Sequence, residues 1–151
     1  MTLHKRILLA EDDPNDVELT LTVFAEFGLA DKLDVVRDGQ EALDYLYRRG
    51  SWSNRPDGNP VAVLLDLKMP RVDGLEVLRQ IKTDPVTRAT PVIMLTSSRE
   101  ERDLVKSYCL GVNAYVVKPA GFQDFTKAIR EISTFWVLVN EAPDSGQICP
   151  E

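Results

Sequence analysis

Short apolar runs recur along the chain at intervals of roughly 20 to 30 residues. The runs ILLA, VAVLL, VIML and AYVV occupy residues 7–10, 61–65, 92–95 and 114–117, and a weaker run, LDVV, occupies residues 33–36. A strand with one face in water alternates polar and apolar residues, whereas a strand covered on both faces is apolar throughout. The runs therefore predict five strands of a parallel sheet that is covered on both sides.

The segments between these runs have the spacing of amphipathic helices. Strands that alternate with helices predict a doubly wound α/β domain: a five-stranded parallel sheet in the flavodoxin-like order 2-1-3-4-5, with helices on both faces. The last segment has the longest apolar stripe and predicts one helix of nearly five turns. The positions expected to face the sheet are Val17, Leu21, Phe24, Ala42, Leu43, Leu46, Leu75, Leu78, Ile81, Leu104, Tyr108, Phe122, Phe125, Ile129, Ile132, Trp136 and Val139.

Two of the expected helices begin with capping signals. Asp13 stands directly before Pro14, and Ser98 stands three residues before Glu101. Asp and Ser side chains accept hydrogen bonds from the free N–H groups at a helix start, and Pro is favoured at the first helical position. We expect Asp13 and Ser98 to be N-caps.

Composition limits the classes of partner and the number of domains. The net charge of −6 and the pI near 4.9 argue against nucleic-acid binding, which needs a basic patch. No apolar stretch reaches 18 residues, so we expect no membrane span. Cys109 and Cys149 are too few for a disulfide framework or a zinc site, which favours free thiols and a cytoplasmic protein.

We expect one folded domain over residues 1–134 and an extension over 135–151 that ends in a disordered tail.

Charged and hydroxyl side chains follow the predicted strands where their carboxyl ends share one edge of the sheet. Glu11 and Asp12 follow the first strand, Asp66 the third, Thr96 the fourth and Lys118 the fifth. Three carboxylates gathered at one edge repel each other and require a cation. Ligands that are all oxygen favour a hard ion, and Mg²⁺ also binds phosphate oxygens. The sequence therefore predicts a Mg²⁺ site at this edge.

The same residues carry a family resemblance. The pattern Glu11-Asp12, Asp66, Thr96-Ser97, Tyr115 and Lys118-Pro119 resembles the receiver domain of two-component response regulators, over residues 5 to about 133. Each motif falls in the family's order at a predicted strand end, and this joint occurrence is what makes the pattern specific. The resemblance implies a domain that signals when it is phosphorylated, rather than an enzyme with a substrate of its own.

The resemblance also implies a role for each residue. Asp66 accepts a phosphoryl group from a phosphohistidine of a partner histidine kinase, and Thr96 and Lys118 contact the other phosphoryl oxygens. The backbone carbonyl of Lys68 joins Glu11, Asp12 and Asp66 around Mg²⁺.

A switch follows from the same resemblance. Inward motion of Thr96 frees space that Tyr115 fills by changing its rotamer, and the small side chain of Ser97 leaves access to Asp66. The altered surface then changes protein–protein contacts.

The stretch STFWVLV at residues 133–139 continues beyond the family pattern. Phe135, Val137 and Leu138 lie outside or at the edge of the helical stripe and would leave apolar surface exposed on a monomer. Trp and Phe are common interface anchors, so we expect Phe135, Trp136 and Leu138 to form a homodimer contact, with a tail that folds back on its own domain as the alternative. This region and the polar insert at 48–60 resemble small response regulators that accompany bacterial phytochromes, which makes a phytochrome a candidate kinase.

Other functions of α/β proteins have sequence requirements of their own. A haloacid dehalogenase-type phosphatase would need an acid at position 68, where this chain has a lysine, and a nucleotide-binding loop would be rich in glycine where this chain has EDDPND. The single histidine, His4, lies near the chain start, and no GxxxxGK[ST] motif occurs, so the phosphoryl group is expected to come from another protein. A pseudo-receiver that is never phosphorylated, a phosphorelay shuttle and a phosphate sink are the alternatives.

Overall fold

Five parallel strands form the centre of the molecule. The structure is a computed structural model that describes residues 5–143 and 148–150. Its strand order is β2-β1-β3-β4-β5, so the predicted sheet is confirmed. The strands are β1 (Ile7–Ala10), β2 (Leu33–Val36), β3 (Ala62–Leu65), β4 (Val92–Thr96) and β5 (Ala114–Val117).

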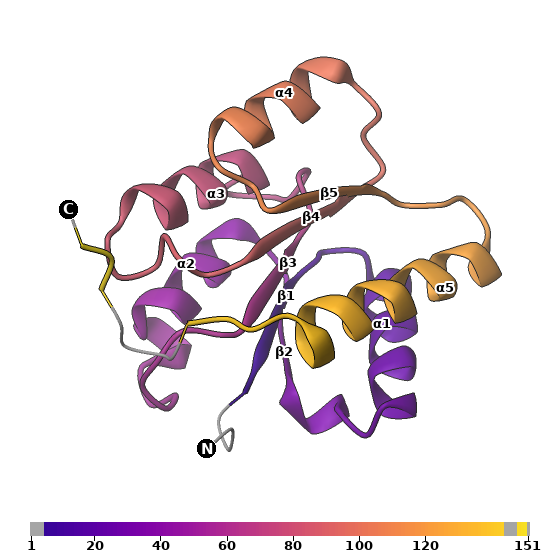
Figure 1. Ribbon diagram of the computed structural model, residues 1–151, viewed down its shortest axis with the longest axis horizontal. Helices are drawn as coiled ribbons and strands as arrows, with labels where there is room; N and C mark the ends of the chain where they lie inside the picture. Colours follow the sequence, from indigo (N-terminus) through magenta and orange to yellow (C-terminus); the bar gives the residue numbers. More distant parts are fainter. Residues whose placement is uncertain (1–4, 144–147, 151) are drawn as a thin grey trace.

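Helices cover both faces of this sheet. Helices α1 and α5 lie on one side, and α2, α3 and α4 lie on the other (Figure 1). The α-helices are α1 (Pro14–Glu26), α2 (Gly39–Tyr47), α3 (Gly74–Thr83), α4 (Glu101–Cys109) and α5 (Phe122–Ser133), and short 3₁₀ turns span Ala30–Lys32 and Gly50–Trp52.

The strands divide their side chains between two apolar cores. In β1, Leu8 and Ala10 join the core beneath α2 and α3, whereas Ile7 and Leu9 join the core beneath α1 and α5. All four residues are at most 2% exposed. Because successive residues of a strand point to opposite faces, burial on both faces requires an apolar residue at every position. This explains the continuous runs in the sequence.

The prediction that Leu104 and Tyr108 of α4 face the sheet is wrong. Leu104 and Tyr108 are 38% and 54% exposed, while Asp103 and Ser107 are buried. The Asp103 carboxylate accepts a hydrogen bond of 2.6 Å from the Ser98 hydroxyl, and the Ser107 hydroxyl donates to the Asp103 carbonyl at 2.8 Å. Polar side chains can be buried on the inner face of a helix when they are hydrogen-bonded. The spacing of the apolar residues in α4 therefore predicted the wrong inner face.

The last helix is shorter than its apolar stripe predicted. Helix α5 ends at Ser133 and continues as a π-helix, η3 (Thr134–Val139). A π-helix has more residues per turn than an α-helix, so the face that meets the core rotates. As a result Val137 is buried, contrary to the expectation, while Val139 is 59% exposed. Phe122, at the other end, is 64% exposed and does not belong to the core face.

One of the two predicted caps is confirmed. The Asp13 carboxylate accepts from the N–H groups of Asn15 at 2.8 Å and Asp16 at 3.4 Å. Ser98 is not the N-cap of α4, because Glu100 holds that position without a side-chain hydrogen bond. The Ser98 hydroxyl instead donates to Asp103 within the helix.

The end of the chain returns to the body of the molecule. The Cys149 N–H donates to the Pro85 carbonyl at 3.1 Å, and Arg88 donates to the Pro150 carbonyl at 2.9 Å. Residues 144–147 and 151, which belong to the expected disordered tail, and His4 lie outside the described residues. The division of the chain at residue 134 stays a prediction, and the burial of Val137 shows that at least one residue beyond it packs into the core.

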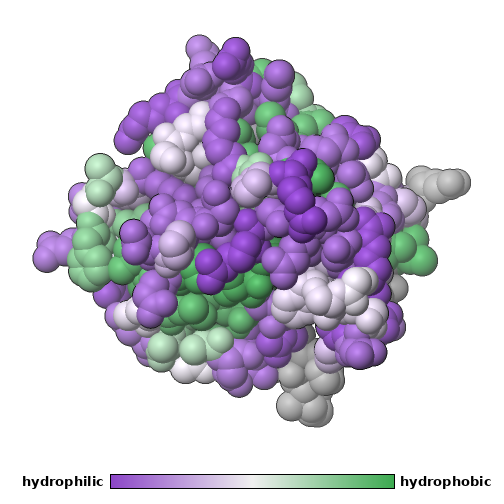
Figure 2. Space-filling view, turned by 180° about the vertical axis from the view of Figure 1, so that it is seen from behind, coloured by the Kyte–Doolittle hydropathy of each residue, from purple (hydrophilic) through white to green (hydrophobic). Residues whose placement is uncertain are grey.

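One face of the molecule is mainly polar. The back of the molecule is hydrophilic over most of its area and carries an apolar area near its centre (Figure 2). Within the described residues, no helix is both long and apolar enough to cross a membrane. The exposed large apolar side chains are Tyr47, Val86, Leu104, Val105, Tyr108, Phe122, Phe135, Leu138, Val139 and Ile148.

Candidate functional site

The register of the sheet places the first two acidic positions side by side. Strands β1 and β3 are neighbours, with Ala10 opposite Leu65, so Glu11 and Asp66 leave the sheet at the same level. The Asp66 N–H donates to the Ala10 carbonyl at 3.0 Å and continues the ladder by one residue. Glu11 and Asp66 are only 2% and 7% exposed, because both emerge from strands that are buried on both faces.

The other half of the site comes from β4 and β5 in the same way. Thr96 ends β4 opposite Val117 of β5, and the Lys118 N–H donates to the Thr96 carbonyl at 2.7 Å. The Thr96 side chain is fully buried. Four strand ends therefore deliver the predicted residues to one edge of the sheet, as expected from their positions in the chain.

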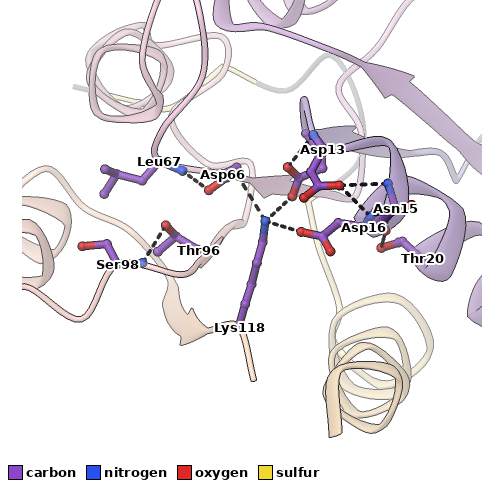
Figure 3. Close-up of polar contacts among 10 residues, drawn as sticks. Asp13, Asn15, Asp16, Thr20, Asp66, Leu67, Thr96, Ser98 and Lys118 are labelled. Atoms are coloured by element: carbon purple, nitrogen blue, oxygen red, sulfur yellow. Dashed lines mark hydrogen bonds and ion pairs between the residues drawn. The ribbon is translucent and has the colours of Figure 1, made fainter. Parts of the chain in front are cut away.

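The Lys118 ammonium lies at the centre of this edge. It donates to Glu11 Oε1 at 2.5 Å, to Asp16 Oδ2 at 2.8 Å and to Asp66 Oδ2 at 3.3 Å. Figure 3 shows Asp66 and Asp16 on opposite sides of this ammonium. Sequence reasoning missed Asp16, because its position in the first turn of α1 is an ordinary place for an exposed acid.

The three predicted acidic ligands fit a divalent cation. Glu11, Asp12 and Asp66 each offer a carboxylate oxygen, and these oxygens lie within 4.8 Å of one another. Glu11 and Asp66 are buried and Asp12 is exposed, so the group has one open side. A small hard cation that keeps several waters suits this combination of oxygen ligands and solvent access.

Burial perturbs the ionisation of this cluster. Burial raises the pKa of Glu11 to about 8, and the charge of Asp66 adds to the rise, although the hydrogen bond from Lys118 opposes it. Burial alone would lower the pKa of Lys118, but its hydrogen bonds to Asp16 and Glu11 and the charge of Asp66 raise it. The lysine therefore stays charged in the cluster, whereas burial favours the protonated form of Glu11.

The predicted switch residues meet at one residue, Ser98, of the loop after β4. The Ser98 N–H donates to the Thr96 hydroxyl oxygen at 3.2 Å, and the Tyr115 hydroxyl donates to the Ser98 carbonyl at 3.1 Å. Ser97, between them, is exposed. The loop backbone at Ser98 thus connects the threonine of the site to the half-buried tyrosine of β5.

The remaining predicted residues lie outside this cluster. Lys68 follows Asp66 by two residues and has an exposed side chain, and the metal role of its carbonyl stays a prediction. Phe135 and Leu138 of η3 are 50% and 55% exposed. Trp136 packs partly against the core beneath α5, with its ring 5.0 Å from that of Phe135.

Comparison with known families agrees with this geometry. The family model described as the response regulator receiver domain matches residues 7–130 of the chain. The chain belongs to the response regulator receiver family. The resemblance seen in its motifs is therefore confirmed, and phosphorylation on an aspartate is typical of this family.

Individual relatives of this receiver are associated with phytochromes. Response regulator Rcp1 of Synechocystis sp. is 38% identical, over 88% of this chain and 89% of its own. The crystal structure of the phosphorylated cyanobacterial phytochrome response regulator RcpA has a TM-score of 0.87 at 37% identity and covers 93% of this chain and 99% of that one. The bacteriophytochrome response regulator AtBRR is 59% identical with a TM-score of 0.70, covering 91% and 98%. A further structure is the Mn²⁺-bound form of Rcp1, with a TM-score of 0.84 at 37% identity, covering 92% and 99%.

The raised pKa of Glu11 makes the stability of the metal-free receiver depend on pH. The folded chain holds this proton up to a pH of about 8, whereas the unfolded chain releases it near 4.5. The stabilisation from Glu11 is therefore complete below pH 4.5 and is lost as the pH rises through about 8. We expect the free energy of unfolding of the wild type, relative to Glu11→Gln, to fall by about 4 kcal/mol between pH 5 and 9, since each pKa unit corresponds to about 1.36 kcal/mol. Urea unfolding in EDTA measures this difference, and a difference that is constant with pH would contradict the assignment.

Proposed function

We propose that this receiver is a cytoplasmic response regulator that accepts a phosphoryl group on Asp66 from a phosphohistidine of a partner kinase. The observation that carries the proposal is the convergence of Glu11, Asp12 and Asp66 around one point, with Lys118 donating to Asp66. A carboxylate is a weak nucleophile and needs the charge of the incoming phosphoryl group to be neutralised. The free thiols of Cys109 and Cys149 agree with a reducing compartment.

Asp66, Lys118 and Thr96 would have different roles in phosphoryl transfer. Asp66 Oδ1 accepts from the Leu67 N–H at 2.7 Å, which fixes the carboxylate while Oδ2 faces Lys118. Phosphoryl transfer depends mainly on position and on charge stabilisation, and a buried ammonium supplies both. The Thr96 hydroxyl becomes a donor to a phosphoryl oxygen when it turns away from Ser98.

Glu11, Asp12, Asp66 and the carbonyl of Lys68 are the groups that would hold Mg²⁺. When bound, this ion would supply positive charge for the phosphoryl oxygens. Two observations support it: the carboxylate oxygens lie within 4.8 Å of one another, and the relative Rcp1 has a Mn²⁺-bound form.

A histidine kinase is the proposed partner, and the phytochrome association of the relatives makes a bacteriophytochrome the first candidate. An open depression of about 520 Å³ beside Lys118 supports docking at this edge. Its lining includes Leu19, Ser97 and Phe122, and the 64% exposure of Phe122 leaves an apolar contact at its rim.

We expect phosphotransfer from a purified, autophosphorylated bacteriophytochrome kinase in Mg²⁺ and none in EDTA. The experiment uses a panel of radiolabelled kinases and follows the label on gels with time. A preference of at least about tenfold in rate, or about 1.4 kcal/mol, would identify the cognate kinase. A receiver that no kinase and no acetyl phosphate labels would be a pseudo-receiver, and onward transfer to a histidine phosphotransfer protein would instead show a relay shuttle.

Phosphorylation would reach the surface through the loop at Ser98. A phosphoryl group adds a charge of about −1.5 to −2 and strong acceptor oxygens, which attract the Thr96 hydroxyl. This motion would break the hydrogen bond from the Ser98 N–H, and the Tyr115 hydroxyl donates to the carbonyl of the same residue. We propose that Tyr115 then changes rotamer and that the altered surface of α4, β5 and α5 selects the next protein.

We propose in addition that η3 forms a homodimer contact. Phe135 and Leu138 are half exposed within one short helix, and such anchors favour an interface. The double variant Phe135→Ser with Leu138→Ser is expected to convert a dimer into a monomer, which multi-angle light scattering measures. These positions are better suited than truncation, because Val137 between them is a core residue.

The matched control for this test is Val86→Ser. Val86 is 44% exposed and lies in the loop before β4, outside η3. We expect this variant to keep the dimer mass. A wild-type chain that runs as a monomer at all concentrations would exclude the homodimer.

A further inference from the structure

Asp16 is a fourth carboxylate at the site that the family pattern did not point to. Its Oδ2 accepts from the Lys118 ammonium at 2.8 Å, with side chains that are 22% and 9% exposed (Figure 3). The backbone around it is held in place: the Asp16 N–H is capped by Asp13, and the Thr20 hydroxyl donates to the Asp16 carbonyl at 2.7 Å. The carboxylate therefore has a fixed position relative to Lys118.

The three carboxylates that bind Lys118 are not equivalent. Glu11 and Asp66 also belong to the group of oxygens that converge on one point, whereas Asp16 lies outside that group in the described part of the chain. A divalent cation and the ammonium therefore compete for Glu11 and Asp66. Nothing competes in this way for Asp16.

We propose that Asp16 is a positioning residue that keeps the Lys118 ammonium at the α1 side of the site while Glu11 and Asp66 turn to a divalent cation. An ammonium has three N–H donors, and here they point to three carboxylates. If Asp16 stays bound to the ammonium, the N–H donors that contact Glu11 and Asp66 can leave these carboxylates. The buried positive charge of Lys118 then still has a carboxylate partner. The released donors are then free for phosphoryl oxygens. The role in phosphoryl transfer rests on the proposed function, whereas the effect on metal binding stands without it.

Removal of this carboxylate should make Lys118 a stronger competitor of the metal. In Asp16→Asn the ammonium keeps only Glu11 and Asp66 as carboxyl partners, so metal binding must break its remaining contacts with both of them. We expect Mg²⁺ affinity, measured by calorimetric titration with MgCl₂ and no phosphodonor, to fall about tenfold, or about 1.4 kcal/mol. Asp16→Glu keeps a carboxylate and should restore most of the affinity.

Two comparisons separate this role from a simple loss of negative charge. Asp13→Asn removes a charge from the same end of α1 and keeps a good N-cap, and Asp13 is not among the carboxylates that accept from Lys118, so Mg²⁺ affinity should change less than twofold. In the Lys118→Met background, Asp16→Asn should also change the affinity less than twofold. An equal loss of affinity with and without Lys118 would overturn the proposal, as would an unchanged affinity in Asp16→Asn alone.

A spectroscopic measurement tests the position of the lysine directly. With saturating Mg²⁺, the ¹⁵Nζ–¹Hζ correlation of Lys118 should be visible in the wild type, because Asp16 still protects the ammonium from exchange with water. It should broaden in Asp16→Asn and return in Asp16→Glu. A signal that is equally sharp in Asp16→Asn would contradict the proposal. If these results hold while Asp66→Asn is still phosphorylated, the positioning role stands and the proposed phosphoacceptor falls.

Discussion

Asp66→Asn is expected to abolish labelling by acetyl phosphate in the presence of Mg²⁺. An amide cannot supply the carboxylate oxygen that attacks phosphorus, so the loss should be complete and should not depend on donor concentration. The fold should survive, because the remaining amide oxygen can accept from the Leu67 N–H as Oδ1 does now. Intact-mass spectrometry of the labelled protein measures the effect.

The matched control for this variant is Asp13→Asn. It makes the same chemical change two residues after Glu11, at a carboxylate that caps α1, and Asn is an equally good cap. We expect it to label at close to the wild-type rate. Undiminished labelling of Asp66→Asn would move the acceptor to another residue and would refute the proposed role of Asp66.

Gly74→Ala is expected to lower the free energy of unfolding by about 3 kcal/mol, at the upper end of the cost of overpacking. A Cβ at this position would lie 2.2 Å from the Asp66 carbonyl oxygen and 2.8 Å from Leu67 Cα. These are backbone atoms of the loop that carries the phosphoacceptor, and the Gly74 N–H also donates to the Leu67 carbonyl at 2.8 Å. The loop must shift to admit the methyl group. Urea unfolding measures the change in stability.

Gly121→Ala provides the comparison for this substitution. Gly121 precedes α5 with φ of −90°, and a Cβ there would meet nothing within 4 Å. Gly121 is the N-cap of α5, where Ala is less favourable than Gly, so the effect should stay within about 1 kcal/mol. Equal effects of the two variants would show that the close approach of Gly74 to the Asp66 loop does not matter for stability.

The parallel sheet was predictable because its signal is local and repeated. Each strand is buried on both faces, and such burial leaves an apolar residue at every position of the run. The site was predictable for a related reason, since parallel strands bring their carboxyl ends to one edge, and the predicted acidic ligands, Thr96 and Lys118 lie at the end of a strand or within two residues after it. Glu11 and Asp66 needed no further information than the ends of β1 and β3.

The helices were harder, because an apolar spacing does not say which face meets the core. In α4 the buried face contains Asp103, whose partner Ser98 lies in the preceding loop, and the apolar Leu104 and Tyr108 face outward. After α5, the change to a π-helix at Thr134 turned Val137 inward. Neither event has a signature in the spacing of apolar residues alone.

Asp16 is the residue of the site that the sequence did not predict and the tertiary structure revealed. The sequence by itself determined that this chain forms a five-stranded parallel sheet with Glu11, Asp12, Asp66, Thr96 and Lys118 at one edge, because periodicity and strand ends are properties of contiguous residues. Only the tertiary structure decided that Lys118 contacts a carboxylate 102 positions earlier in the chain. That contact depends on how α1 packs against the sheet, which sums many weak interactions between distant residues.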